Sequence, residues 1–176
     1  MTSASSFITK QSAQLNKKLK QLTKELNLAD PTTICVASKY ATAGQIQQLY
    51  DEGFRVFGEN KIQDGIQKIQ QLEALDIEWH FIGHLQKNKV NKAVQYFDVI
   101  QSVDSFELLE KINQSAQNCN KQITCFIQLN TGYDPKKFGL LPEDFLKEKE
   151  KFFSLSNVVI KGIMVIAPYL EDNKKL

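Results

Sequence analysis

Residues 34–40 read Ile34-Cys35-Val36-Ala37-Ser38-Lys39-Tyr40, and this stretch decides how the rest of the chain is interpreted. Its apolar, β-branched first half predicts a buried strand, and the run ends abruptly in Ser38-Lys39. Parallel α/β folds place chemistry at the carboxyl ends of strands, where a partly desolvated lysine has a lowered pKa and can act as a nucleophile. The alternative is a lysine that turns out to solvent, and from these seven residues alone that interpretation is favoured.

The same unit, a short apolar strand followed by an amphipathic helix, recurs along the chain. A first amphipathic helix comes before the strand at 34–39, with leucines at helical spacing over residues 15–26. Such alternation, with strands apolar on both faces, is typical of a parallel sheet covered by helices, either a barrel or a doubly wound sheet. Neither a G-x-G-x-x-G nor a P-loop motif occurs to support the doubly wound alternative. The predicted strands cover residues 34–39, 54–57, 78–83, 97–102, 123–130 and 158–166.

Several residues predict where helices begin and end. Thr42 can cap the second helix, and Gly53 supplies its stop. Asp104 with Glu107 resembles a capping box. Pro142 stands where a first helical residue should be.

Composition predicts one domain with a real core, because the chain has 176 residues of which 42% are apolar. The formal charge of +2 gives no strong attraction to nucleic acid, and the single guanidinium belongs to Arg55. Three cysteines without a C-x-x-C motif fit a reducing, cytoplasmic setting. The first ten residues lack the apolar core of a signal peptide, and no apolar run is long enough to span a membrane.

Three predicted strands end in residues whose side chains could bind a ligand or react, namely Ser38-Lys39, Gly58-Glu59-Asn60 and Gly83-His84-Leu85-Gln86. Strand carboxyl ends lie on one face of a parallel sheet, so a lysine, an amide and an imidazole could surround a single opening. Such an arrangement suits a carbonyl compound or a cofactor, although spacing alone does not show that the three groups meet. For the carboxylate of Glu59, a hydrogen-bonded structural role is the favoured interpretation.

Other candidate motifs are weaker. His80 and His84 are four residues apart, but the glutamate of an H-E-x-x-H site is absent and the segment between them is typical of a strand. The lysines at 87, 89 and 92 lack interleaved aromatic residues, which favours a solvated helix face over nucleic-acid binding. Turn chemistry alone explains the polar loop 134–139.

At these positions the sequence closely resembles the pyridoxal phosphate homeostasis protein family, of the YggS/PROSC type. The run from Trp79 to Lys89, W-H-F-I-G-H-L-Q-K-N-K, is highly specific, and the resemblance extends over nearly the whole chain. The other matching stretches are Val36–Lys39, Phe57–Asn60, Ser102–Asp104, Leu129–Thr131, Lys137–Gly139 and Gly162–Met164.

The resemblance implies a (β/α)8 barrel like that of alanine racemase and eukaryotic ornithine decarboxylase, without their second domain. Lys39 would hold pyridoxal 5'-phosphate as an aldimine, and Asn60 and His84 match positions around the cofactor. Family members are regarded as cytoplasmic carriers or regulators of this cofactor, serving pyridoxal-phosphate-dependent apoenzymes, with no clear catalytic turnover. Racemisation needs a second base on the opposite ring face, which nothing beyond the barrel supplies.

Two alternatives remain open. An amino-acid racemase or decarboxylase would act through the same lysine, and an interaction module would use the helix at 87–92. The leading interpretation includes no nucleic-acid, membrane or metal binding, and it leaves the oligomeric state undecided.

The sequence departs from the family pattern in two places. Tyr40-Ala41-Thr42 replaces the usual Thr-Lys-Pro after the reactive lysine, so a second lysine is missing. The chain also ends at Leu176, after strand six, whereas a full barrel has eight strand-helix units. We therefore expect a single domain, 1–176, without the last two units, which in the family hold the cofactor phosphate. Weakened cofactor affinity and unpaired sheet edges are expected to follow.

Overall fold

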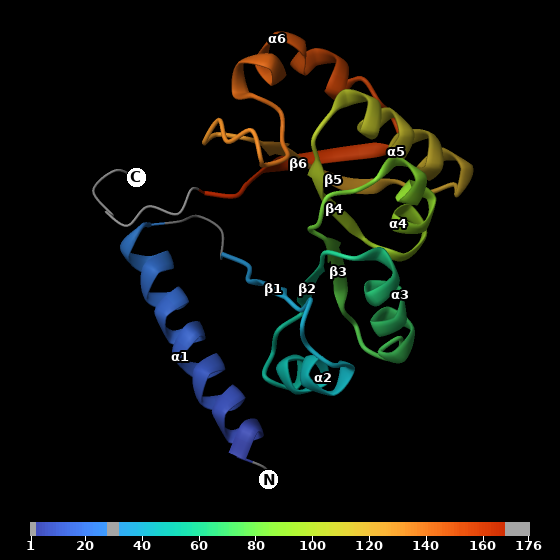
Figure 1. Cartoon of the computed structure of the whole chain (residues 1–176). Coiled ribbons are helices and arrows are strands. Elements are labelled where there is room, and N and C mark those ends of the chain that lie inside the picture. Colours follow the sequence, from blue (N-terminus) through green and yellow to red (C-terminus); the bar gives the residue numbers. More distant parts are fainter. Residues whose placement is uncertain (1–2, 28–31, 168–176) are drawn as a thin grey trace. The chain divides into compact units, whose positions relative to one another are not determined.

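The computed structural model describes residues 3–27 and 32–167, with side chains described from residue 8 onward. Helices and strands alternate along the chain (Figure 1). The helices are α1 (Ser3–Glu25), α2 (Ala43–Asp51), α3 (Ile62–Gln71), α4 (Val90–Tyr96), α5 (Phe106–Asn118) and α6 (Pro142–Phe153), with a 3-10 turn η1 (Lys87–Lys89) before α4. The strands are β1 (Cys35–Ala37), β2 (Val56–Glu59), β3 (Glu78–Phe81), β4 (Val99–Val103), β5 (Ile123–Leu129) and β6 (Val158–Val165).

The six strands follow one another in the sheet in chain order, β1-β2-β3-β4-β5-β6. The β1–β2, β4–β5 and β5–β6 pairs are parallel. This confirms the predicted α/β fold with six strand-helix units. No helix among the described residues is long and apolar enough to cross a membrane. The chain divides into two compact units, 1–80 and 81–176, so the expected single domain over 1–176 stays a prediction.

In the first unit, β2 provides the core. All four of its residues are buried, and the Phe57 ring packs against Trp79 of β3 with centroids 6.0 Å apart. The prediction of a buried strand at 34–39 is wrong in length and burial, because β1 spans three residues and none of them is buried. Its position at one end of the strand order explains the exposure. The second strand begins two residues later than predicted, at Val56, which pairs with Cys35, the first residue of β1.

In the second unit, aromatic side chains join α5 to α6. Phe152 of α6 meets both Phe106 and Phe145 edge to face, with centroids 5.2 Å and 5.3 Å apart. Such geometry is preferred by aromatic pairs. By contrast, β6 leaves Ile163 and Val165 half exposed. As at β1, a strand at the end of the strand order pairs with one strand only within the described part of the chain.

Three predicted helix boundaries are confirmed. The Thr42 side chain accepts a hydrogen bond from the backbone N–H of Gln45, whose own side chain returns the contact, completing a capping box before α2. Gly53 has a φ of +96°, a left-handed conformation that favours glycine just past a helix end. Pro142 opens α6.

The predicted capping box at Asp104 and Glu107 is wrong. Ser105 is the N-cap residue of α5, and its Oγ accepts from the backbone N–H of Leu108 at 3.3 Å. The Asp104 carboxylate instead lies 3.1 Å from a ring nitrogen of His84. The Asp104 side chain therefore contacts a residue distant in sequence, instead of capping the helix that begins next to it.

Gly139 cannot accept a side chain without backbone movement. Its φ is +125°, and an added Cβ would lie 2.8 Å from both the backbone N of Asn130 and the backbone carbon of Leu129. We expect Gly139→Ala to lower the free energy of unfolding by about 2 kcal/mol. Gly44→Ala in α2, where the nearest atom is 4.0 Å away, should instead raise it by about 0.5 kcal/mol. Urea unfolding of both variants measures this difference, and equal effects would contradict the argument.

The three cysteines should differ sharply in reactivity. Partial burial, followed by the nearby charge of Glu78, raises the pKa of Cys35 to about 11, and full burial raises the pKa of Cys125 to about 12. Both thiols therefore stay protonated, and unreactive, as pH rises from 7 to 9. Cys119 is exposed. Maleimide labelling at pH 8, mapped by mass spectrometry, should modify Cys119 first. Equally fast labelling of Cys125 in the folded protein would contradict this expectation.

Candidate functional site

The pairing of β1 with β2 brings two predicted site residues to neighbouring strand ends. Ala37 pairs with Gly58, and the N–H of Ser38 donates to the carbonyl of Gly58 at 2.9 Å, which carries the pairing one residue further. Lys39 follows Ser38 and Asn60 follows Glu59. The lysine and the amide therefore come directly after the carboxyl ends of neighbouring strands, and both residues are exposed.

Lys39 lies in a tight turn directly after β1. The carbonyl of Ser38 accepts a hydrogen bond from the N–H of Ala41 at 2.8 Å, so Lys39 and Tyr40 occupy the two middle positions of a β-turn. The Lys39 Nζ lies 5.1 Å from the centroid of the Tyr40 ring, which is itself 90% exposed. The expectation of a partly desolvated lysine is wrong for this structure, because the turn carries Lys39 beyond the buried part of the sheet. Its amine is accessible to a ligand from solvent.

Beneath this turn lies a buried polar cluster, Ser38, Glu59 and Lys68. Ser38 and Glu59 are 1% and 0% exposed, and the Lys68 side chain, from α3, is 13% exposed. Glu59 Oε1 accepts from Ser38 Oγ at 2.6 Å and from Lys68 Nζ at 2.7 Å. Lys68 Nζ also donates to the carbonyl of Ser38 at 2.8 Å. The structural role expected for Glu59 agrees with these contacts.

The second carboxylate oxygen of Glu59 has a different environment. Oε2 is buried and makes no hydrogen bond within the described part of the chain. A buried acceptor without a partner costs about 1–3 kcal/mol. The bonds at Oε1 to a hydroxyl and an ammonium therefore have to offset the burial of the whole carboxylate.

His84 lies three residues after β3, in the second unit. Its Nδ1 is 3.1 Å from Asp104 Oδ2, and its ring stacks on Phe138 with centroids 3.6 Å apart and planes 11° apart. His84 is nevertheless an exposed residue. Because Lys39 and Asn60 belong to the first unit, a common site of all three residues stays a prediction.

The loop that carries Phe138 is held by side chains at the end of β5. Gln128 Nε2 donates to the carbonyl of Phe138 at 3.0 Å, and Asn130 Nδ2 donates to the carbonyl of Asp134 at 2.8 Å. The Asp134 side chain accepts from the backbone N–H of Lys136 at 2.9 Å, an Asx-turn contact. Turn chemistry thus explains this loop, as expected.

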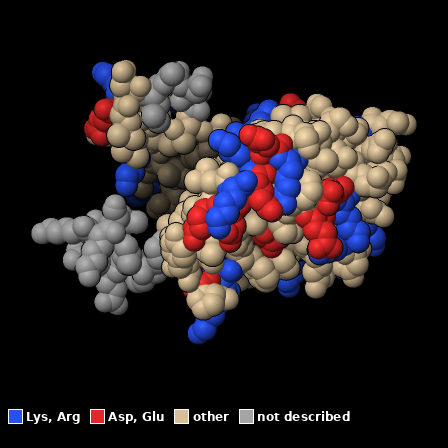
Figure 2. Space-filling view, turned by 90° about the horizontal axis from the view of Figure 1, so that it is seen from above, with Lys and Arg blue, Asp and Glu red and all other residues tan. Residues whose placement is uncertain are grey.

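Charged side chains of both signs alternate over the face seen from above (Figure 2). In the second unit, Lys87 pairs with Glu107, and this contact lowers the pKa of that glutamate, first through the hydrogen bond and then through charge.

His80 Nε2 lies 2.5 Å from Glu78 Oε1. Among residues 3–27 and 32–167 there is no group of three or more His, Cys, Asp or Glu side chains arranged to hold a metal ion.

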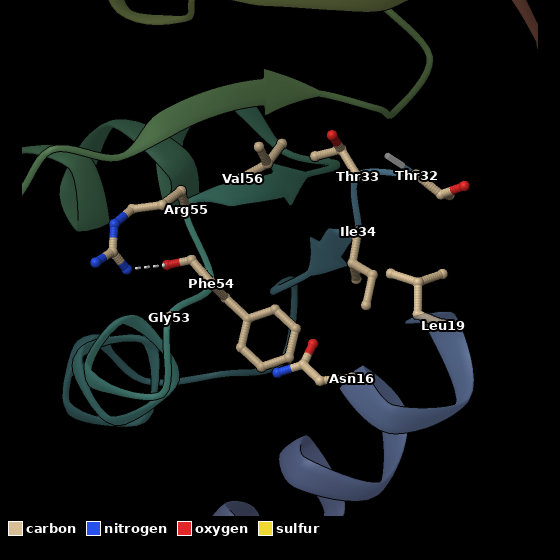
Figure 3. A pocket seen from close by; sticks show the side chains of 9 residues that line it. All are labelled: Asn16, Leu19, Thr32, Thr33, Ile34, Gly53, Phe54, Arg55 and Val56. Carbon is tan, nitrogen blue, oxygen red and sulfur yellow. Dashed lines mark hydrogen bonds between the residues drawn. The ribbon is translucent and has the colours of Figure 1, made fainter. Parts of the chain in front are cut away.

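The guanidinium of Arg55 lies at the start of β2, at the opposite end of the strand from Glu59. It donates to the carbonyls of Tyr50 and Phe54 at 2.7 Å and 2.9 Å, and lies 3.9 Å from the Tyr50 ring centroid. A pocket of about 180 Å³ is found here (Figure 3). It is lined by Asn16, Leu19, Thr32, Thr33, Ile34, Gly53, Phe54, Arg55 and Val56. Because it adjoins the amino end of β2, it is separate from the strand ends at Lys39 and Asn60.

The comparisons with known proteins agree with this architecture. The family model for the alanine racemase N-terminal domain matches residues 11–175. This match defines the class of protein as a barrel-type α/β domain, and six of its strands are present.

The relatives identify the family more closely. The chain is 38% identical over 136 residues to a pyridoxal phosphate homeostasis protein of Aquifex aeolicus, covering 77% of this chain and 60% of that protein. It is 32% identical to the Haemophilus influenzae protein of the same description, covering 90% and 68%. The structure of PipY from Synechococcus elongatus with pyridoxal phosphate bound is 36% identical, with a TM-score of 0.73, over 85% of this chain and 70% of that one. The chain belongs to the alanine racemase N-terminal domain family and, within it, to the pyridoxal phosphate homeostasis proteins.

The buried pair should matter far more for stability than the surface pair. We expect Glu59→Gln to lower the free energy of unfolding by about 3 kcal/mol, because Lys68 then loses the charge that compensates its own burial. Glu107→Gln, which breaks the exposed contact with Lys87, should cause no measurable change. Denaturant titrations of both variants test this, and a Glu59→Gln protein as stable as Glu107→Gln would contradict it.

Proposed function

We propose that this chain binds pyridoxal 5'-phosphate, with Lys39 as the residue that attaches to it covalently, and that it acts in cofactor homeostasis without catalytic turnover. The observation that carries the proposal is the accessible Lys39 amine in an ordered turn at the end of β1. Membership of the family and the relative of known structure that contains the cofactor support it. The chain spans 60% and 68% of the lengths of the two relatives described above.

The residues present fit part of such a ligand. When bound, pyridoxal phosphate supplies an aldehyde that an amine can attack, and an exposed lysine at a strand end provides that amine. The exposed side chain of Asn60 lies at the neighbouring strand end, where it can hydrogen-bond a polar ring substituent. His84 would take part through Nε2, since Nδ1 faces Asp104.

The proposal assigns no racemase or decarboxylase activity to the chain. Either reaction would need a second acid-base group facing the cofactor from the side opposite Lys39. The proposal also includes a cytoplasmic location and delivery of the cofactor to pyridoxal-phosphate-dependent apoenzymes. Both of these rest on family membership.

The decisive experiment is to incubate the purified chain with pyridoxal phosphate, reduce it with borohydride and map the modified lysines by mass spectrometry. We expect Lys39 to be labelled on the order of tenfold more than the average exposed lysine, because the site brings the aldehyde close to it. Lys39→Ala should remove this labelling, and Lys61→Ala, which changes an exposed lysine at the start of α3, should not. Labelling spread evenly over the exposed lysines, and unchanged in Lys39→Ala, would refute the proposal.

A further inference from the structure

We propose that Lys68 and Glu59 are positioning residues that hold the peptide group carrying Lys39 in the orientation needed for attachment of the cofactor. This inference rests on the function proposed above, and it assigns a role to a lysine of α3 through its contacts with Ser38 and Glu59. The contacts that support it all lie within the first unit.

The carbonyl of Ser38 belongs to the peptide bond that joins Ser38 to Lys39. It accepts two hydrogen bonds, from the backbone N–H of Ala41 at 2.8 Å and from Lys68 Nζ at 2.8 Å. The first closes the turn around Lys39, and the second fixes this peptide plane to helix α3. Two donors on one carbonyl restrict rotation of the plane from which the Lys39 side chain departs.

The other polar groups of Ser38 are fixed as well. Its N–H donates to the carbonyl of Gly58 at 2.9 Å, and its Oγ donates to Glu59 Oε1 at 2.6 Å. Every hydrogen-bonding group of Ser38 therefore has a partner on β2, α3 or the turn. Lys39 is the first residue beyond this fixed point, so its backbone starts from a defined position while its amine remains exposed.

Charge complementarity orients Lys68 toward the strand ends. Lysine side chains on helices usually extend their ammonium groups into water. Here the ammonium lies 2.7 Å from Glu59 Oε1, and the carboxylate is fully buried. The negative charge draws Lys68 inward, where its remaining donors reach the carbonyl of Ser38. Glu59 thus acts on Lys39 through two routes, the Ser38 hydroxyl and the Lys68 ammonium.

Loss of Lys68 should slow attachment without changing the amine. The Ser38 carbonyl would keep only its bond to Ala41, and the turn would spend less time in the orientation that brings Lys39 Nζ to the aldehyde. The Lys39 amine is exposed, and Lys68 bonds the Ser38 carbonyl and Glu59 rather than that amine, so the substitution removes no partner of the amine itself. A purely structural role would instead change stability and leave the rate of attachment in the folded protein unaltered.

The test measures the rate at which Lys39 is labelled in the whole chain, using short incubations with pyridoxal phosphate followed by borohydride and mass spectrometry. We expect Lys68→Met to slow labelling of Lys39 about tenfold relative to the other exposed lysines of the same sample. Lys68→Arg, which retains a charged donor, should recover part of the rate. Lys17→Met, which changes an exposed lysine of α1, serves as the matched control and should behave as the parent chain does.

The outcomes separate this inference from the proposed function. Selective labelling of Lys39 in the parent chain, at a rate unchanged in folded Lys68→Met, would overturn the positioning role and leave the function standing. An absence of selective labelling in the parent chain would overturn both. If circular dichroism shows that Lys68→Met is unfolded, the double variant Glu59→Gln/Lys68→Met decides, because it removes both charges together and leaves neither unpaired. Slower labelling of Lys39 in the folded double variant supports the inference, and an unchanged rate overturns it.

Discussion

The parallel register between β1 and β2 is the constraint on which the candidate site depends. Because Ala37 pairs with Gly58, the next residue of each strand brings Ser38 beside Glu59, which it contacts, and Lys39 and Asn60 follow directly. A shift of β2 by one residue against β1 would turn its side chains to the opposite face and separate Glu59 from Ser38. The buried cluster beneath the turn of Lys39 therefore depends on this one alignment.

The ion pairs Lys68–Glu59 and Lys87–Glu107 differ in burial, and this difference determines what each pair contributes. Lys68 and Glu59 are shielded from water, so each depends on the other, and their hydrogen bonds specify a single arrangement of the strand ends. Lys87 and Glu107 meet on the surface, where water competes for both charges. A lysine and a glutamate thus fix the backbone at the ends of β1 and β2, where they are buried. The same two residue types form only a surface contact at Lys87 and Glu107.

Local patterns predicted the elements well and their contacts poorly. The alternation of apolar strands and helices, the cap at Thr42 and the proline at the start of α6 depend on neighbouring residues, so the sequence predicts them correctly. The capping role expected of Asp104 failed because His84, twenty residues earlier, takes its carboxylate. The sequence predicted no role for Lys68. Its partners Ser38 and Glu59 lie thirty and nine residues away, so no pattern of neighbouring residues points to these contacts.

His84 illustrates how the surroundings of a candidate residue restrict its chemistry. The stacked ring of Phe138 covers one face of the imidazole, and Asp104 occupies Nδ1. Phe138 is itself tied to the end of β5, because its carbonyl accepts from Gln128. The imidazole therefore has its orientation set by a loop rather than by its own strand. Any ligand that uses His84 must approach the other face or the Nε2 edge, unless the contact with Phe138 is broken first.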